Sequence, residues 1–267
     1  MYATRDEYVV RARTYDDDYP PLADDDPMIA FMRNRISEGA RVVEFGIGTG
    51  RVAIPLLHSG CRLWGIDISA EMLARLAAKD EANGIETMEG SFLDTRAPGA
   101  FAAVVCVFNT LYHVHAQDGQ VQALKAAADH LEPDGFLFLE NTSALHITER
   151  YGDGSRILLQ DIGNTSLWLL AAQMCAIEQR LRITHIKMTD SGTSLAPVTF
   201  RYIWPAELRL MAQQAGLQIA EEYGDWSQHP FDGSSTSHIV VMRKNGRPTA
   251  DDALPAHRKG YSRNIAD

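Results

Sequence analysis

The stretch that decides the fold is Val42-Val43-Glu44-Phe45-Gly46-Ile47-Gly48-Thr49-Gly50. Its first residues favour a buried strand, and helical spacing resumes in residues 51–58. Three alternating glycines between a strand and a helix let the backbone pass close to a ligand. The spacing is G-x-G-x-G, whereas the dinucleotide fingerprint is G-x-G-x-x-G. The stretch therefore predicts a ligand-binding turn that opens an α/β sheet, with a purely structural tight turn as the alternative.

Two acidic side chains accompany this turn. Glu44 stands two residues before Gly46, where a carboxylate stabilises a cationic ligand and does nothing for a pyrophosphate. Asp67 follows the next predicted strand, residues 61–66. In a doubly wound sheet this position faces the crevice beside the first loop, and an acid there can accept hydrogen bonds from both hydroxyls of a ribose. The alternative for Asp67 is a role at the start of the next helix, for which Ser69 is a suitable N-cap.

The pattern of predicted strands and helices changes near residue 145. Before that point, strands and helices alternate, which predicts a parallel sheet with right-handed crossovers. Predicted strands there are 41–45, 61–66, 85–88, 101–108 and 136–140, with a helix at about 117–131. Beyond it, extended runs without long helices predict an inserted antiparallel meander, at 156–160, 166–175, 177–189 and 195–203. A helix at 205–215 and strands at 217–223 and 238–243 complete the pattern.

The composition narrows the class of protein. The chain has 267 residues and a formal net charge of −10, which disfavours a nucleic-acid partner. Its three cysteines are far apart in the sequence and show no metal-ligand spacing. No apolar run approaches the length of a membrane span, and the first residues are acidic. We therefore expect a cytoplasmic protein with no membrane or nucleic-acid partner and no metal.

The segment from about Arg41 to Glu140 resembles the cofactor half of class I S-adenosylmethionine-dependent methyltransferases. Members of that family carry an acid-containing strand followed by a G-x-G-x-G loop, matched by Val42–Gly50. The family's acid after the second strand, with a bulky residue soon after, is matched by Gly65-Ile66-Asp67-Ile68-Ser69 with Met72. Its adenine-binding segment is matched by Gly90-Ser91-Phe92-Leu93-Asp94, and the segment beside the sulfonium by Phe108-Asn109-Thr110-Leu111-Tyr112-His113. The turn before the fifth strand is matched by Leu131-Glu132-Pro133-Asp134-Gly135. Ser91 departs from the family, which often has aspartate at that position.

The segment beyond Glu140 is similar to small-molecule N- and O-methyltransferases, including amino-sugar N-methyltransferases. These often carry an antiparallel lid, and an N-terminal segment with tyrosines closes over the cofactor, as Tyr15 to Tyr19 would here. The resemblance implies an α/β fold, a Rossmann-like doubly wound seven-stranded mostly parallel sheet with an inserted antiparallel β lid. We expect a single domain at 1–245, with the lid at about 145–203 and a flexible tail at 246–267.

The resemblance also implies S-adenosylmethionine as cofactor and S-adenosylhomocysteine as product. The expected cofactor-binding residues are Tyr19, Glu44, Gly46, Gly48, Gly50, Asp67, Ile68, Met72, Ser91, Phe92, Phe108 and Asn109. Two residues are candidates for catalysis. His113 follows the fourth strand, where its ordinary pKa suits a general base, with a hydrogen-bonding role at the rim of the site as the alternative. Tyr15 can orient an amine or the carboxylate of the cofactor. His115 is a second candidate base, and Glu140 either faces the substrate or caps the next helix. Trp168, Phe200, Tyr202 and Trp204 either line an acceptor pocket or only pack.

These features predict methyl transfer to a small-molecule acceptor, with an amine nitrogen of a natural-product intermediate favoured. The alternatives are O-methylation with His113 as base, an NAD-dependent oxidoreductase, or a non-catalytic protein that binds S-adenosylmethionine. The expected oligomeric state is a monomer or a homodimer.

Overall fold

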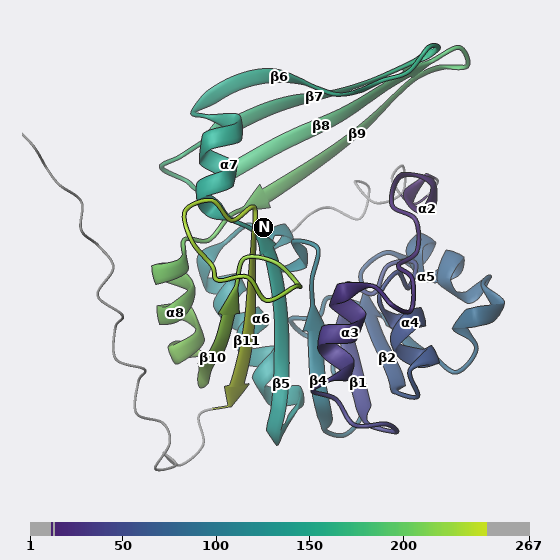
Figure 1. Cartoon of the computed structure of the whole chain (residues 1–267), viewed down its shortest axis with the longest axis vertical. Helices are drawn as coiled ribbons and strands as arrows, with labels where there is room; N and C mark the ends of the chain where they lie inside the picture. The colour runs from purple at the N-terminus through teal and green to yellow at the C-terminus, as the bar shows by residue number, and fades with distance from the viewer. Residues whose placement is uncertain (1–11, 13, 245–267) are drawn as a thin grey trace, which may run out of the picture.

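The computed structural model describes residue 12 and residues 14–244. A seven-stranded sheet forms its centre, in the order β10-β11-β5-β4-β1-β2-β3 (Figure 1). The strands are β1 (Arg41–Phe45), β2 (Arg62–Asp67), β3 (Glu86–Glu89), β4 (Phe101–Cys106), β5 (Leu131–Thr142), β10 (Leu217–Tyr223) and β11 (Ser237–Lys244). The first five are mutually parallel, and β11 runs antiparallel to both β5 and β10. The predicted seven-stranded, mostly parallel sheet is confirmed.

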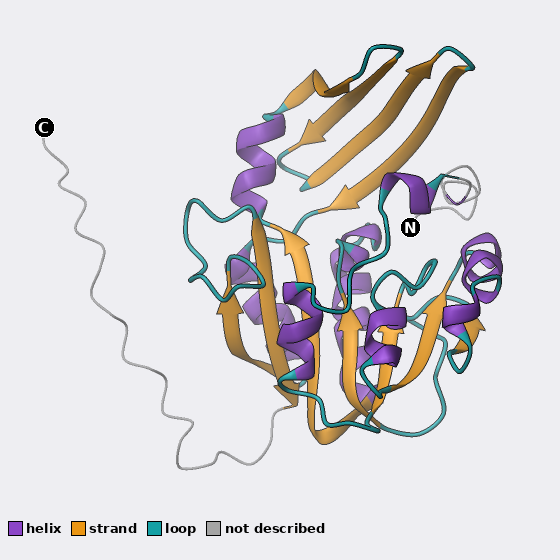
Figure 2. Cartoon of the chain, turned by 45° about the vertical axis from the view of Figure 1, so that its right-hand side comes forward, coloured by secondary structure: helices purple, strands orange, loops and turns teal. Residues whose placement is uncertain are grey.

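A second sheet has four antiparallel strands in the order β6-β7-β8-β9. These are β6 (Gly154–Ile162), β7 (Ser166–Cys175), β8 (Arg180–Thr189) and β9 (Gly192–Arg201). Figures 1 and 2 show this sheet above the edge of the central sheet at which the parallel strands end. We call it the lid sheet. Its predicted antiparallel arrangement is confirmed, and its position covers the edge where ligands bind in open α/β sheets.

Alternating strand residues face two separate apolar layers. On β1, Val42 packs with helices α3 (Pro27–Arg33) and α4 (Ala53–His58), while Val43 packs on the opposite layer. That second layer includes α6 (Gln117–His130) and α8 (Pro205–Gln214). Strands that are buried on both faces in this way read as continuous apolar runs in the sequence. The other described helices are α2 (Tyr15–Asp18), α5 (Ala70–Ala77), η1 (Asp80–Ala82), η2 (Thr110–His113) and α7 (Ala144–Tyr151).

Local capping fixes where the helices next to the glycine turn begin. The Asp26 carboxylate accepts a hydrogen bond from the Met28 backbone N–H at 2.8 Å, with Pro27 at the first position of α3. The Ser69 hydroxyl accepts one from the Met72 N–H at 3.2 Å at the start of α5. Ser69 is therefore the N-cap of α5, as its position predicted, and Asp67 is left for another role.

The lid sheet is joined to the core by a buried polar network at the end of β9. Arg201 is only 9% exposed; its guanidinium donates to the Gln120 side-chain oxygen and to the Glu207 carboxylate, each at 2.7 Å. The Gln120 amide donates in turn to the backbone carbonyls of Arg201 and Leu111. One side chain of α6 thus connects the root of the lid sheet to the η2 turn.

Two local expectations differ from the structure. A helix, α7, precedes the lid strands, whereas the sequence predicted only extended runs there. It was not predicted because its eight residues are too few to show a helical pattern and include the β-branched Ile147 and Thr148. The predicted turn at Pro133-Asp134-Gly135 lies within β5, beside a register irregularity against β4. The predicted tail at 246–267 lies outside the described residues. Within the described part of the chain, no helix is long and apolar enough to cross a membrane.

Candidate functional site

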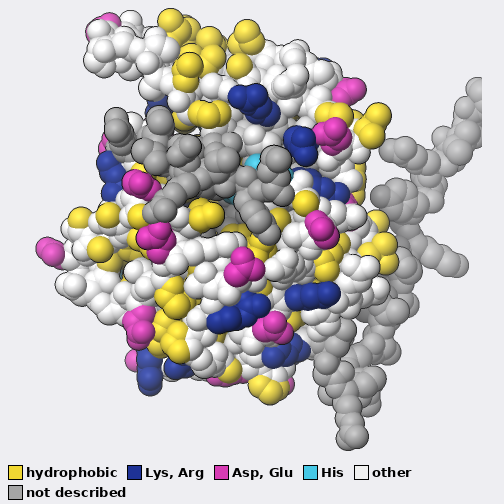
Figure 3. Space-filling model, turned by 180° about the vertical axis from the view of Figure 1, so that it is seen from behind, with side chains coloured by type: hydrophobic (Ala, Val, Ile, Leu, Met, Phe, Trp, Pro, Cys, Tyr) yellow, Lys and Arg dark blue, Asp and Glu magenta, His cyan; other side chains and the backbone are white. Residues whose placement is uncertain are grey.

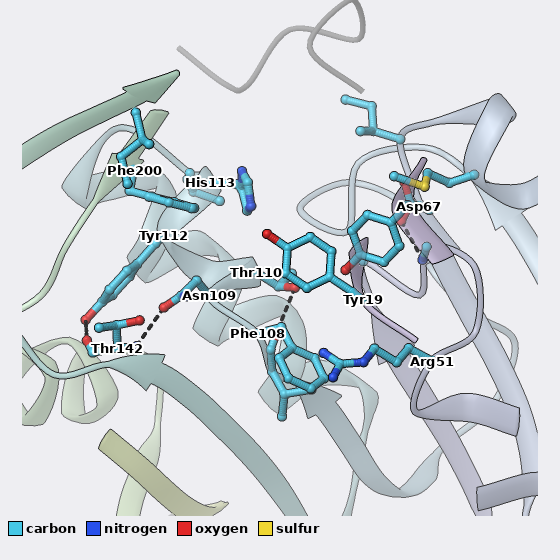
Figure 4. A pocket seen from close by; sticks show the side chains of 18 of the residues that line it. Tyr19, Arg51, Asp67, Phe108, Asn109, Thr110, Tyr112, His113, Thr142 and Phe200 are labelled. Carbon is cyan, nitrogen blue, oxygen red and sulfur yellow. Dashed lines mark hydrogen bonds between the residues drawn. The ribbon is translucent and has the colours of Figure 1, made fainter. Parts of the chain in front are cut away.

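A chamber of about 410 Å³ lies between the lid sheet and the ends of the parallel strands. This volume is typical of small-molecule sites. Figure 4 shows side chains that reach it from the end of β2, from the segment after β4, from the end of β5 and from the lid sheet. Every predicted site residue except Gly50 lines it: Tyr15, Tyr19, Glu44, Gly46, Gly48, Asp67, Ile68, Met72, Ser91, Phe92, Phe108, Asn109 and His113. Segments that are far apart in the sequence therefore converge on one cavity.

The glycine turn follows β1 with its backbone in the left-handed region. Gly46 has φ +68°, and a Cβ there would lie 2.8 Å from Thr110 Cγ2. Gly50 has φ +84°, and a Cβ there would lie 2.4 Å from Leu76 Cδ1 on α5. Side chains at both positions would be strained and would clash. Gly50 thus packs the turn against α5 and does not line the chamber, in contrast to its expected place among the ligand contacts.

Asp67, at the end of β2, is 7% exposed and is hydrogen-bonded to the glycine turn. Its Oδ2 accepts a hydrogen bond from the Gly48 backbone N–H at 2.8 Å, and its Oδ1 accepts one from the Ser69 N–H at 2.9 Å. Burial raises its pKa, and these backbone donors oppose the rise. Because each carboxylate oxygen has further acceptor capacity, Asp67 can hold the turn and still accept hydrogen bonds from a ligand in the chamber.

Glu44 is a buried acid whose carboxylate is incompletely hydrogen-bonded within the described part of the chain. It is 4% exposed, and its Oε2 has no hydrogen-bond partner among the residues that the structure describes. Burial, followed by the negative charge of Asp67, raises its pKa well above the ordinary value. A cationic ligand group would relieve both effects. The ammonium and sulfonium of S-adenosylmethionine supply such charge, so this end of the chamber fits that cofactor.

The loop after β4 carries strain where it borders the chamber. Phe108 and Asn109 have φ +53° and +64°, a conformation that non-glycine residues rarely adopt. The Glu140 carboxylate accepts hydrogen bonds from the Phe108 backbone N–H and from the Trp226 indole, and the Asn109 side chain accepts one from the Thr142 N–H at 2.6 Å. Glu140 therefore neither lines the chamber nor caps α7, the two roles expected for it; it holds this loop.

The lid end of the chamber is built from η2, α7 and the lid sheet. The His113 ring packs edge-on against Phe200 with a centroid distance of 4.9 Å. The other lining side chains from these elements and from the residue after η2 are Thr110, Tyr112, Val114, His146, Ile147, Arg150, Tyr151, Leu181, Ile183 and His185. His115 lies outside the lining, half-buried and hydrogen-bonded to the Thr199 carbonyl at 2.9 Å. His113 is thus the better placed of the two candidate bases.

Only one of the four aromatic candidates of the lid region lines the chamber. Phe200 does so, whereas Tyr202 is fully buried in the core and Trp204 is exposed outside the lining. Trp168 packs against the Lys187 ammonium, with 4.2 Å from Nζ to the ring centroid. Tyr202 and Trp168 therefore pack, and the partly exposed Trp204 contacts the Tyr202 ring edge-on.

The α2 segment bridges the glycine turn and the lid sheet. The Asp16 carboxylate accepts hydrogen bonds from the Thr49 hydroxyl at 2.6 Å and from the Lys79 ammonium at 3.1 Å. Asp18 forms an ion pair with Lys187 of β8. Tyr15 and Tyr19, on and just after α2, line the chamber between these anchors. Both tyrosines therefore border the cavity, and their contact with the ligand stays a prediction.

Sequence reasoning missed Arg51, which also lines the chamber. Its guanidinium carbon lies 4.2 Å from the centroid of the Phe108 ring (Figure 4). Its Nε donates to the Pro20 carbonyl. A planar guanidinium here can bind a carboxylate. Its position directly after Gly50 was the available signal. No group of three or more candidate metal ligands occurs among the described residues.

Comparison with known proteins identifies relatives of this chain. A family model described as a methyltransferase domain matches residues 42–135. The structure of the CcbJ methyltransferase from Streptomyces caelestis superposes with a TM-score of 0.82 and 30% identity, covering 88% of this chain and 96% of that chain. The cypemycin N-terminal methyltransferase of a Streptomyces species is 27% identical over 213 residues, which are 79% of this chain and 86% of that protein.

A further solved structure is similar in fold. It is CalS10 with bound S-adenosylmethionine, an amino pentose methyltransferase from Micromonospora echinaspora. It has a TM-score of 0.64 and 19% identity and covers 91% of this chain and 98% of that chain.

Proposed function

Because the chain belongs to the S-adenosylmethionine-dependent methyltransferases, we propose that it methylates an amine nitrogen of a small-molecule natural-product intermediate. One observation carries the proposal: a single chamber joins the acidic pair Glu44 and Asp67 to the lid end that contains His113. The name of one relative, the cypemycin N-terminal methyltransferase, also favours nitrogen. The NAD-dependent and non-catalytic alternatives receive no support from these relatives.

We assign the cofactor to the acidic end of the chamber. When bound, S-adenosylmethionine supplies a methyl group that is activated on a sulfonium. Asp67 would accept hydrogen bonds from its ribose hydroxyls, and Glu44 would stabilise its positive charge. Arg51 would pair with its carboxylate, while Ser91 and Phe92 would contact the adenine. The remaining expected contacts, Tyr19, Gly46, Gly48, Ile68, Met72, Phe108 and Asn109, would enclose it and exclude water.

We assign the acceptor to the lid end. An amine attacks only when it is unprotonated, so the residues around it need to align it and keep it neutral. His113 lies in this part of the lining, where it can take the proton that the nitrogen releases. Tyr15 can orient the nitrogen from the α2 side. Phe200 and Ile183 would exclude water from the nucleophile.

Replacing His113 with glutamine distinguishes N-methylation from O-methylation. For a neutral amine we expect kcat/KM to fall less than about tenfold at a pH where the amine is unprotonated, since no general base is needed. A hydroxyl acceptor would lose about 10²- to 10⁴-fold, which is the usual contribution of a general base. The second candidate function, O-methylation, is favoured by the His113 position in the chamber. The measurement is S-adenosylhomocysteine release from a panel of amines and alcohols.

The outcome on that panel decides between nitrogen and oxygen. Turnover of amines that survives H113Q supports the proposal. Turnover of alcohols alone, abolished by H113Q, would replace it by O-methylation. The affinity for S-adenosylhomocysteine serves as the control for folding, and it should not change.

Cofactor binding is expected to release protons through Glu44. Burial and Asp67 raise the pKa of Glu44 in the free protein, and a bound ammonium lowers it again. Binding therefore displaces a proton wherever the pH lies between the two values. The affinity for S-adenosylhomocysteine should rise with pH through this window and then level off. Calorimetry in buffers of different ionisation enthalpy measures the proton count, and E44Q should abolish the release. An unchanged proton release in E44Q would assign it to another group.

A further inference from the structure

The lid end of the chamber has side chains of one charge type. Its ionisable lining from η2, α7 and β8 consists of Arg150 and the histidines His113, His146 and His185, with Tyr112 and Tyr151. The described lining contains two carboxylates, those of Glu44 and Asp67, and both belong to the ends of β1 and β2. The acids are therefore confined to one end of the cavity, which also contains Arg51, whereas the lid end has no described carboxylate.

This division runs against the charge of the protein as a whole. The chain has 35 acidic and 25 basic residues and a formal net charge of −10. On the outer face seen in Figure 3, acidic and basic side chains are interspersed. A cavity end with an arginine and histidines and no described carboxylate departs from that background. Local charge of this kind concentrates a ligand of the opposite sign.

Helix geometry gives α7 a face suited to an anion. His146 and Arg150 are four residues apart, so they lie one turn apart on the same side of α7. Ile147, which is buried, lies beside them on the wall of the chamber. Arg150 donates one hydrogen bond to the Gln160 side chain at 3.3 Å. A guanidinium has five N–H donors in a planar fork, so most of its donors remain for a ligand.

We infer that the methyl acceptor carries an oxyanion, either a carboxylate or a phosphate ester, and that Arg150 with His146 binds it. The inference rests on the proposed function, since it assumes that the acceptor occupies the lid end. An arginine recognises both oxyanions through two parallel hydrogen bonds. The arrangement also suits an amine nucleophile, because the positive charge of Arg150 and of the sulfonium disfavours its protonated form. An oxyanion on the same molecule balances that charge.

The inference is tested on protein saturated with S-adenosylhomocysteine, with three probes of similar shape. Phenylacetate and phenyl phosphate carry the two oxyanions, and phenylacetamide is the neutral counterpart. We expect at least one oxyanion to bind at least tenfold more tightly than the amide in calorimetric titration. R150Q should remove that preference. The two oxyanions also distinguish a carboxylate acceptor from a phosphate ester.

A matched arginine on the lid sheet controls for general charge effects. Arg182 is exposed on β8 between Leu181 and Ile183, which line the chamber. Because neighbouring strand residues point to opposite faces, R182Q removes the same charge from outside the chamber and should keep the preference.

Each outcome decides the inference. Equal binding of oxyanions and amide, no oxyanion binding, or a preference that survives R150Q would overturn the inference. If S-adenosylhomocysteine still binds, these outcomes leave the proposed function unaffected. A failure of S-adenosylhomocysteine itself to bind would instead overturn the proposed function, and the inference with it.

Discussion

Replacing Asp67 with alanine is expected to weaken S-adenosylhomocysteine binding about a hundredfold, or roughly 2.7 kcal/mol. Two losses contribute. The ribose hydroxyls lose a charged acceptor, and each hydrogen bond to a charged group is worth about 1.5–3 kcal/mol. The Gly48 N–H also loses its partner at 2.8 Å, which loosens the glycine turn. Calorimetric titration measures the change.

Two further variants make the result for Asp67 specific. D67N keeps one acceptor oxygen and should bind with intermediate affinity. D129A removes an exposed aspartate whose contact with Arg96 is long, 3.7 Å, and should bind like the unaltered protein. A folded D67A protein that binds within about threefold of the unaltered affinity, roughly 0.65 kcal/mol, would remove Asp67 from the cofactor site.

Replacing Arg201 with methionine is expected to lower the free energy of unfolding by about 3–5 kcal/mol. Removing one partner of a buried ion pair leaves the other uncompensated and carries a cost of that size. The guanidinium and the Glu207 carboxylate are 11% and 15% exposed and 2.7 Å apart. Gln120 would lose its contact to the guanidinium as well. Chemical denaturation at neutral pH measures the change, and a loss below about 1 kcal/mol would contradict the account.

The pH dependence of this loss identifies Glu207 as its source. Burial raises the pKa of Glu207, but hydrogen bonds from Gln179 and Arg201 outweigh burial and hold the pKa below its ordinary value. The stabilisation is therefore complete above the unfolded-state pKa and is lost as pH falls through the folded-state pKa. The R201M penalty should shrink under acid, and adding E207Q should recover part of it at neutral pH.

Much of the fold followed from the sequence because its signals are local. Strands buried on both faces, such as β4, appear as unbroken apolar runs, and the left-handed turn after β1 requires glycine at Gly46 and Gly50. Helix α7 escaped prediction because it is one of the short elements whose stability comes from packing and not from propensity.

The acidic end of the site was predictable, whereas the lid end was not. Glu44 and Asp67 lie at strand ends next to the glycine turn, so sequence neighbours become spatial neighbours. The lining by Arg150 and His185 depends on how α7 and the lid sheet fold over the core, which no local pattern encodes. Glu140 shows the same limit. Its position at a strand end suggested substrate contact or helix capping, but tertiary contacts turn it toward Phe108 and Trp226.

The most direct test of the central claim is a crystal structure of the protein with S-adenosylhomocysteine. We expect the ribose hydroxyls within hydrogen-bond distance of Asp67 and the ammonium toward Glu44. We expect the sulfur to point toward His113, with the lid end left for the acceptor. A ligand bound in the opposite direction, or with its ribose held by other residues, would contradict this placement.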